Sequence, residues 1–218
     1  MEIIDRTAET AGITRTRNDP PKEIYSQRNR QSLNRLQGAF LHQTYFFNPN
    51  PSRYDYTIAH FIVLRRGDVL QVRPLTAGLN SVSNGRAVDI EFEGRYPSLR
   101  QIRHLRRTDA PVPHPTLPQL LAGRALLRHL RDTLGIAHVW GHRQASRMQR
   151  DDCPGPQLWY NVGEWAVRNL GLSSSGLRES VPVAWRTERS LELVWPSPLE
   201  EPWGDERFDT MISRLNRW

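Results

Sequence analysis

Two histidines and the single cysteine stand where apolar segments of the sequence give way to loops. His42 ends the run GAFLH, His142 follows the segment AHVWG, and Cys153 precedes a Pro-Gly turn eleven residues after His142. A catalytic zinc ion takes three protein ligands of these types and leaves a fourth position for water. Each residue alone has a simpler explanation, since a lone cysteine is most often a small buried hydrophobe. The residue types therefore permit a zinc site without requiring one.

Acidic residues that could move protons lie on one predicted strand. In AVDIEFEG, the acids at positions 89, 91 and 93 alternate with the apolar residues at 88, 90 and 92. This alternation predicts a β-strand with Glu91 and Glu93 on its polar face. A carboxylate held near a metal site can act as a general acid or base. The same pattern also fits a solvated strand face, and the alternation does not decide between the two.

The elements that must position these residues are indicated by local patterns. Two β-rich runs at 59–64 and 69–72, joined by a turn containing Gly67, predict a hairpin. Leucine spacing over 116–134 predicts a helix that tolerates Pro118 in its first turn and stops at Gly135. A short strand is expected at 137–140 and a second helix at 159–171. This order predicts an α/β fold with a central mixed sheet and flanking helices.

The composition indicates one domain with extensions and a basic surface. The chain has 218 residues, with 30 Lys+Arg against 23 Asp+Glu and a net charge of +7. Such a charge favours polyanionic partners such as nucleic acid, acidic wall polymer or a membrane surface. One cysteine allows no internal disulfide. The sequence shows no signal peptide and no run of 18 apolar residues, so we expect a soluble protein without membrane insertion.

Changes in composition divide the chain into three parts. Residues 1–37 are expected to be a polar, basic N-terminal extension, either a loosely ordered arm, which the composition favours, or a segment lying along the surface. Residues 38–171 form the expected domain, and 172–218 a C-terminal extension. Within this extension, 189–195 resembles a strand, and the apolar residues from Phe208 to Leu215 have helical spacing.

Several segments together resemble one known superfamily. GHRQASRMQRDDCPGPQLW is similar to the GHR…(D/C)PGP segment of the zinc-dependent N-acetylmuramoyl-L-alanine amidases. That superfamily includes phage amidase endolysins, bacterial muropeptide amidases and animal peptidoglycan recognition proteins. FLHQT, AHFIVLRRGDVLQVRPL and NGRAVDIEFEG resemble its other characteristic segments in the same order, so the resemblance spans about residues 38–169.

The resemblance implies a site, a cofactor and a reaction. By position, it implies one zinc ion per chain bound by His42, His142 and Cys153, with Glu91 as the catalytic acid and base. The implied reaction is hydrolysis of the amide between the lactyl group of N-acetylmuramic acid and L-alanine of the stem peptide, in peptidoglycan or muropeptides. The implied fold is the single-domain amidase and recognition-protein fold.

Other positions of the resemblance concern the surroundings of the metal. His60 matches a family histidine that does not bind metal, which implies a supporting role. Arg143 and Arg150 are expected to supply positive charge near Cys153 or to contact substrate. Many relatives have a lysine two residues before the third ligand, where this chain has Asp151. The Trp-His-Ala-Gly element of relatives is reduced to TAG.

Two other functions remain as alternatives. A non-catalytic peptidoglycan-binding module of the same fold ranks second, because that branch often lacks the third ligand and Cys153 is present. A nucleic-acid-binding protein would explain the arginine content but gives no reason for GHR…CPGP. An endolysin released by a holin, an antibacterial effector delivered by a secretion system and a recycling amidase are all compatible with the sequence, which leaves the oligomeric state open.

Overall fold

A six-stranded mixed sheet forms the centre of the protein. The computed structural model describes residues 3–18, 20–26, 32–108, 112–145 and 152–192. The strands lie in the order β1-β4-β3-β5-β2-β6, and the only antiparallel pair among them is the β3–β4 hairpin. Their bounds are β1 Ile3–Asp5, β2 Gly38–Gln43, β3 Phe61–Val63, β4 Val69–Gln71, β5 Ala87–Phe92 and β6 His138–Gly141. The predicted α/β fold with a mixed sheet and flanking helices is confirmed.

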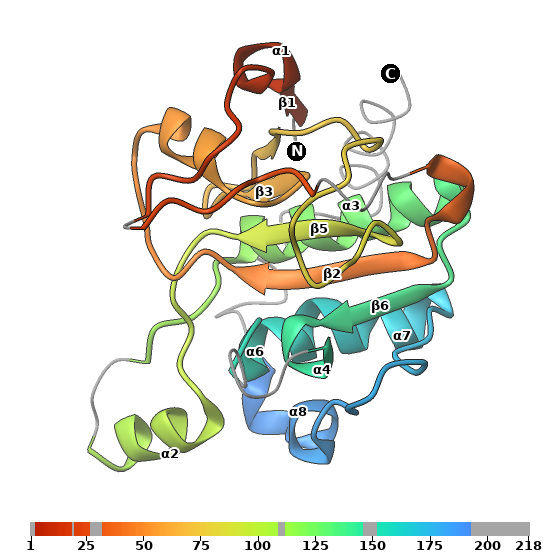
Figure 1. The fold of residues 1–218 in the computed structure, drawn as a ribbon. Helices are drawn as coiled ribbons and strands as arrows, with labels where there is room; N and C mark the ends of the chain where they lie inside the picture. Colours follow the sequence, from red (N-terminus) through yellow and green to blue (C-terminus); the bar gives the residue numbers. More distant parts are fainter. Residues whose placement is uncertain (1–2, 19, 27–31, 109–111, 146–151, 193–218) are drawn as a thin grey trace.

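The helices lie around this sheet (Figure 1). The longest is α3, Leu117–Leu134, and the others are α1 Thr7–Thr10, α2 Leu99–Arg107, α4 His142–Ala145, α6 Pro156–Leu158, α7 Trp165–Leu170 and α8 Val183–Thr187. A π-helical segment, η3, Trp159–Glu164, joins α6 to α7 in one continuous helical stretch. Short 3₁₀ turns occur at η1 Leu33–Arg35, η2 Pro51–Tyr56 and η4 Arg189–Leu191.

The start and end of α3 follow from local chemistry. The Thr116 hydroxyl accepts a hydrogen bond from the backbone N–H of Gln119 and caps the first turn, where Pro118 lacks an N–H that would need a partner. Gly135 ends the helix with a left-handed φ of 65°, a conformation that glycine adopts without steric cost. Both ends lie where the sequence predicted them.

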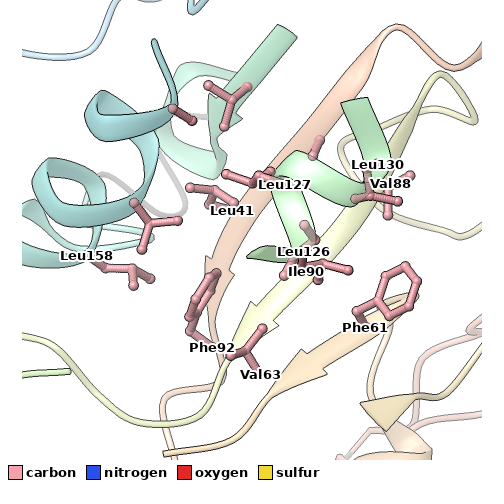
Figure 2. Packing of buried hydrophobic residues seen from close by; sticks show 14 of the residues in the cluster. Leu41, Phe61, Val63, Val88, Ile90, Phe92, Leu126, Leu127, Leu130 and Leu158 are labelled. Atoms are coloured by element: carbon pink, nitrogen blue, oxygen red, sulfur yellow. The ribbon is translucent and has the colours of Figure 1, made fainter. Parts of the chain in front are cut away.

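The main hydrophobic core lies between α3 and one face of the sheet. Figure 2 shows Leu41, Val88, Ile90 and Phe92 of the strands facing Leu126, Leu127 and Leu130 of the helix, and all seven are buried. Gly123 permits this close approach, because a Cβ atom there would lie 2.6 Å from Cε1 of Phe92. Since side chains alternate along a strand, His42 of β2 and Asp89 and Glu91 of β5 point to the opposite face.

The N-terminal segment, residues 3–18 and 20–26, lies along the surface of the sheet rather than forming a loosely ordered arm. Its strand β1 pairs with β4, and Arg6 forms a bidentate ion pair with Asp55 at 2.8 and 2.7 Å. The side chain of Ile24 is completely buried. The polar composition concealed this docking because only a few residues make the buried contacts.

The described part of the C-terminal extension also packs on the domain. Trp185 of α8 belongs to the main core. Ser173 forms two backbone hydrogen bonds beside β6, with the C=O of Ala137 at 2.9 Å and the N–H of Val139 at 3.0 Å. Residues 189–191 form the turn η4, so the strand expected at 189–195 is wrong there, and the predicted helical segment around Phe208 lies outside the described residues. Within the described ranges, no helix is long and apolar enough to cross a membrane.

Candidate metal centre

Strand register brings the two candidate histidines together. β2 pairs in parallel with β6, with Leu41 opposite Gly141, so His42 and His142 follow at the carboxyl ends of neighbouring strands. The carboxyl ends of parallel strands are the usual place for ligands in α/β sheets. The Nδ1 atoms of the two histidines lie 2.9 Å apart, and their rings meet at 73°.

Cys153 completes the group of three possible ligands. One donor atom from each of His42, His142 and Cys153 lies within 4.8 Å of the others, and the cysteine is 1% exposed. The cysteine loop is tied to β6 and α4, because the backbone N–H of Arg143 donates to the C=O of Cys153 at 3.1 Å. The loop packs so closely on Gly141 that a Cβ atom at this position would lie 2.9 Å from Cδ of Pro154, which leaves no room for a larger residue.

Asp89 holds the other side of the His42 ring. Nε2–H of His42 donates to Oδ1 of Asp89 at 3.2 Å, which leaves Nδ1 directed toward His142. Oδ2 of Asp89 accepts from the hydroxyl groups of Ser81 and Ser83 at 2.7 and 2.8 Å, and the carboxylate is fully buried. A metal-binding histidine usually donates its second nitrogen to such an acceptor, which fixes the ring orientation.

The contact between His42 and Asp89 shifts the pKa values of both residues. Burial alone lowers the pKa of His42, but the hydrogen bonds with Asp89 and Cys153 and the nearby charge of Glu91 raise it to about 10. Burial alone raises the pKa of Asp89, but the hydrogen bond and positive charge of His42 hold it below the usual value. Without metal, His42 therefore carries a positive charge at neutral pH and Asp89 a negative one.

His60 supports Asp89 and is not among the three clustered ligands. Its Nδ1 accepts a hydrogen bond from the backbone N–H of Asp89 at 3.0 Å, and its Nε2 donates to the C=O of Ala77 at 3.1 Å. Burial lowers the pKa of His60. The ring is therefore neutral, with its proton on Nε2, and it fixes the strand that carries Asp89.

Glu91 lies beside the metal ligands on the neighbouring strand. β2 and β5 pair in parallel with His42 opposite Glu91, and both side chains lie on the sheet face away from α3. The partly exposed Glu91 lines a cavity of about 430 Å³ at the end of β2. The alternation also allowed the acids of this strand to form a solvated face. That alternative is wrong for Asp89 and Glu93, because both side chains are buried.

Arg143 and Arg150 were expected to lie near Cys153 or the substrate. The guanidinium carbon of Arg143 lies 4.7 Å from the centre of the Trp185 ring, at the boundary with the C-terminal extension. Arg150 and Asp151 lie outside the described residues. Sequence reasoning did not select Asp89 or its serine partners, although the alternation placed position 89 on the same face as Glu91.

Comparison with known protein families identifies the family of this chain. A family model described as N-acetylmuramoyl-L-alanine amidase matches residues 11–156. The chain belongs to this amidase family. No curated protein matches the chain. The matched residues of this amidase-family protein include all three candidate ligands and Glu91.

Solved structures of amidases and recognition proteins share the fold. The N-acetylmuramoyl-L-alanine amidase LysC from Clostridium intestinale URNW is 20% identical, with a TM-score of 0.51 over 79% of this chain and 99% of its own. PGRP-SA from bumblebee is 15% identical, with a TM-score of 0.52 over 80% and 99%. The ectodomain complex of PGRP-LCa and PGRP-LCx, solved bound to tracheal cytotoxin, is 17% identical, with a TM-score of 0.50 over 79% and 99%. At these identities the likeness shows the fold alone.

The donor set of this amidase-family protein fits a zinc ion. Two nitrogens bound tetrahedrally at zinc stand about 3.3 Å apart, from bond lengths of about 2.05 Å, and the two Nδ1 atoms lie 2.9 Å apart. Two imidazoles and one thiol match the preference of zinc for nitrogen and sulfur. The contact between His42 and Asp89 supplies the outer support that such a site needs.

Proposed function

We propose that this protein is a zinc-dependent N-acetylmuramoyl-L-alanine amidase. Its proposed reaction is hydrolysis of the amide between the lactyl group of N-acetylmuramic acid and L-alanine of the stem peptide. One observation carries the proposal: His42, His142 and Cys153 converge at the end of the sheet, with Glu91 directly opposite His42 on the adjacent strand. The family match supports the choice of this amide as the substrate.

The proposed residue roles follow from these positions. Zinc held by the three ligands would polarise the scissile carbonyl and increase the acidity of water near neutral pH. Glu91 removes a proton from the attacking water as its oxygen bonds to the carbonyl carbon, and returns the proton to the alanine nitrogen as the C–N bond breaks. Asp89 keeps Nδ1 of His42 directed toward the metal position, because it accepts the proton on Nε2.

Product analysis tests this reaction directly. Zinc-loaded protein is incubated with whole sacculi and, separately, with soluble anhydro-muropeptides, and the products are identified by mass spectrometry. We expect a free L-alanine amino terminus and an intact lactyl carboxylate in at least one of the two digests. An intact lactyl-alanine amide in both would overturn the proposed function. The comparison also distinguishes a wall-degrading protein from one that acts on released fragments.

A non-catalytic peptidoglycan-binding protein is the second candidate, because solved recognition proteins share the fold. Muropeptide binding by Glu91→Ala, combined with turnover by the parent protein, separates the two functions. An amidase should lose about 10²- to 10⁴-fold in turnover when this acid is removed, while it still binds zinc. Binding without turnover in the parent would establish the recognition role instead.

A further inference from the structure

The N-terminal segment forms one wall of the cavity that contains Glu91. This cavity of about 430 Å³ is lined by the end of β2, by η2 and by residues 16–18 and 22 of the segment. Figure 1 shows the segment running across the front of β3 toward the end of the sheet where β2 and β5 terminate. The segment therefore contributes side chains to the same cavity as Glu91, the proposed catalytic residue.

The segment is held firmly enough to position these side chains. β1 pairs with β4, and Arg6 binds both carboxylate oxygens of Asp55, which belongs to η2. The hydroxyl of Thr10 donates to the C=O of Val72, and Ile24 is buried. The segment and η2 thus form one connected wall.

Three cations from this wall line the cavity. Arg17 and Lys22 come from the N-terminal segment and Arg53 from η2, and all three side chains are exposed. Nη2 of Arg17 donates to the hydroxyl of Tyr56 at 2.6 Å, and its guanidinium carbon lies 3.8 Å from the centre of the same ring. A guanidinium group has five N–H donors, so this contact orients Arg17 and leaves donors for a ligand.

The cations that line the cavity outnumber its acids. Within the described part of the chain, Glu91 is the one acid that lines it, and no acidic side chain forms an ion pair with any of the three cations. A ligand that fits must therefore present a neutral reacting group to Glu91 and an anionic group to the wall. Arginine suits a carboxylate especially well, because its planar group can form two parallel hydrogen bonds.

We propose that Arg17 and Arg53 recognise a carboxylate of the stem peptide, so that the N-terminal segment determines specificity for anionic stems. This inference rests on the proposed function, because the amide cleaved near Glu91 fixes where the peptide begins. The carboxylate lies on the peptide side of the scissile bond and contributes to binding in the ground state as well as during the reaction. Removal of these cations should therefore raise KM more than it lowers kcat.

A matched pair of substrates tests the inference. One is a soluble muramoyl peptide with free carboxylates, and the other is the same compound with those carboxylates converted to primary amides. We expect the parent protein to prefer the carboxylate form by about tenfold in kcat/KM, as for loss of one charge-assisted hydrogen bond. Arg17→Ala and Arg53→Ala should bring this ratio close to one, and high salt should reduce it.

Control variants separate this effect from misfolding and from a general loss of charge. Arg100→Ala removes the same charge from exposed α2, outside this cavity, and should keep the parent's substrate preference. Arg17→Lys keeps the charge but not the paired donors, so it should restore only part of the preference. Within the described ranges, the exposed Arg53 side chain forms no ion pair, so its variant stays informative even if Arg17→Ala fails to fold.

The outcomes distinguish the inference from the function on which it rests. Hydrolysis of both substrates by the parent protein with equal kcat/KM would overturn the inference and leave the amidase function intact. Hydrolysis of neither would overturn the proposed function, and calorimetric binding of the two compounds to Glu91→Ala would then decide the inference. Equal affinity for the two compounds in that measurement would refute carboxylate recognition.

Discussion

Replacement of Asp89 tests whether the metal site depends on the residue that holds His42. The carboxylate accepts three side-chain hydrogen bonds, from His42 at 3.2 Å and from Ser81 and Ser83 at 2.7 and 2.8 Å. Asp89→Asn keeps the shape and one acceptor oxygen but removes the charge. Because loss of such an outer partner costs about 10- to 100-fold in metal affinity, we expect a rise of that size in the zinc dissociation constant.

Asp89→Ala removes the acceptor as well as the charge. His42 and the two serine hydroxyls then lose their shared partner in a fully buried position, and each unsatisfied group costs about 1–3 kcal/mol. We expect the free energy of unfolding to fall by at least about 2 kcal/mol in the metal-free protein. Asp89→Asn should lose less, because its amide can still form part of the network.

Chelator competition measures the zinc affinities, and urea unfolding measures stability. Asp132→Asn is a matched control, because this exposed carboxylate lies on α3, which carries none of the metal ligands, and pairs with its neighbour Arg131 at 2.6 Å. That variant should bind zinc like the parent. Parental zinc affinity in both Asp89 variants would refute the argument that this carboxylate orients His42 for the metal.

Three further predictions concern the metal and the core. Zinc affinity should rise with pH, by about tenfold per unit below pH 9 from His42 alone, because its pKa of about 10 means that zinc must displace a proton; a dissociation constant independent of pH would contradict this. Cys153→Ala should weaken zinc binding by at least about 100-fold, measured by the same competition, and unchanged binding would exclude the thiol as a ligand. Gly123→Ala should reduce the free energy of unfolding by about 1–3 kcal/mol, because the new Cβ would lie 2.6 Å from Phe92. Gly12→Ala, where a Cβ meets nothing within 4 Å, should have little effect, and equal unfolding curves for the two variants would count against tight packing at Gly123.

Elements with local causes were predictable from the sequence. The β3–β4 hairpin and α3 were confirmed because their turn and cap residues, such as Thr116 and Gly135, lie within the elements that they shape. The helix α2 was missed although Ser98 and Gln101 form a capping box at its start. The arginines of this segment favoured its interpretation as a charged surface, whereas the capping box was the pattern that indicated a helix.

Contacts between distant segments were less accessible to sequence reasoning. Pairing of β1 with β4 joins residues more than sixty positions apart, and no local pattern in IID indicates it. The meeting of His42 with His142 depends on the register of β2 and β6, so only the family resemblance anticipated it. Asp89 looked like a surface acid, because its partners come from strand pairing and from a separate turn that holds the two serines.

Both edges of the sheet depend on residues outside the proposed 38–171 domain. β1 covers the free edge of β4, and Ser173 forms two backbone hydrogen bonds along the outer side of β6. Exposed strand edges offer unpaired N–H and C=O groups that can recruit strands from other molecules. A chain shortened to 38–171 would therefore expose both edge strands of the sheet to pairing with other molecules. The two extensions thus protect the amidase fold from aggregation by covering these edges.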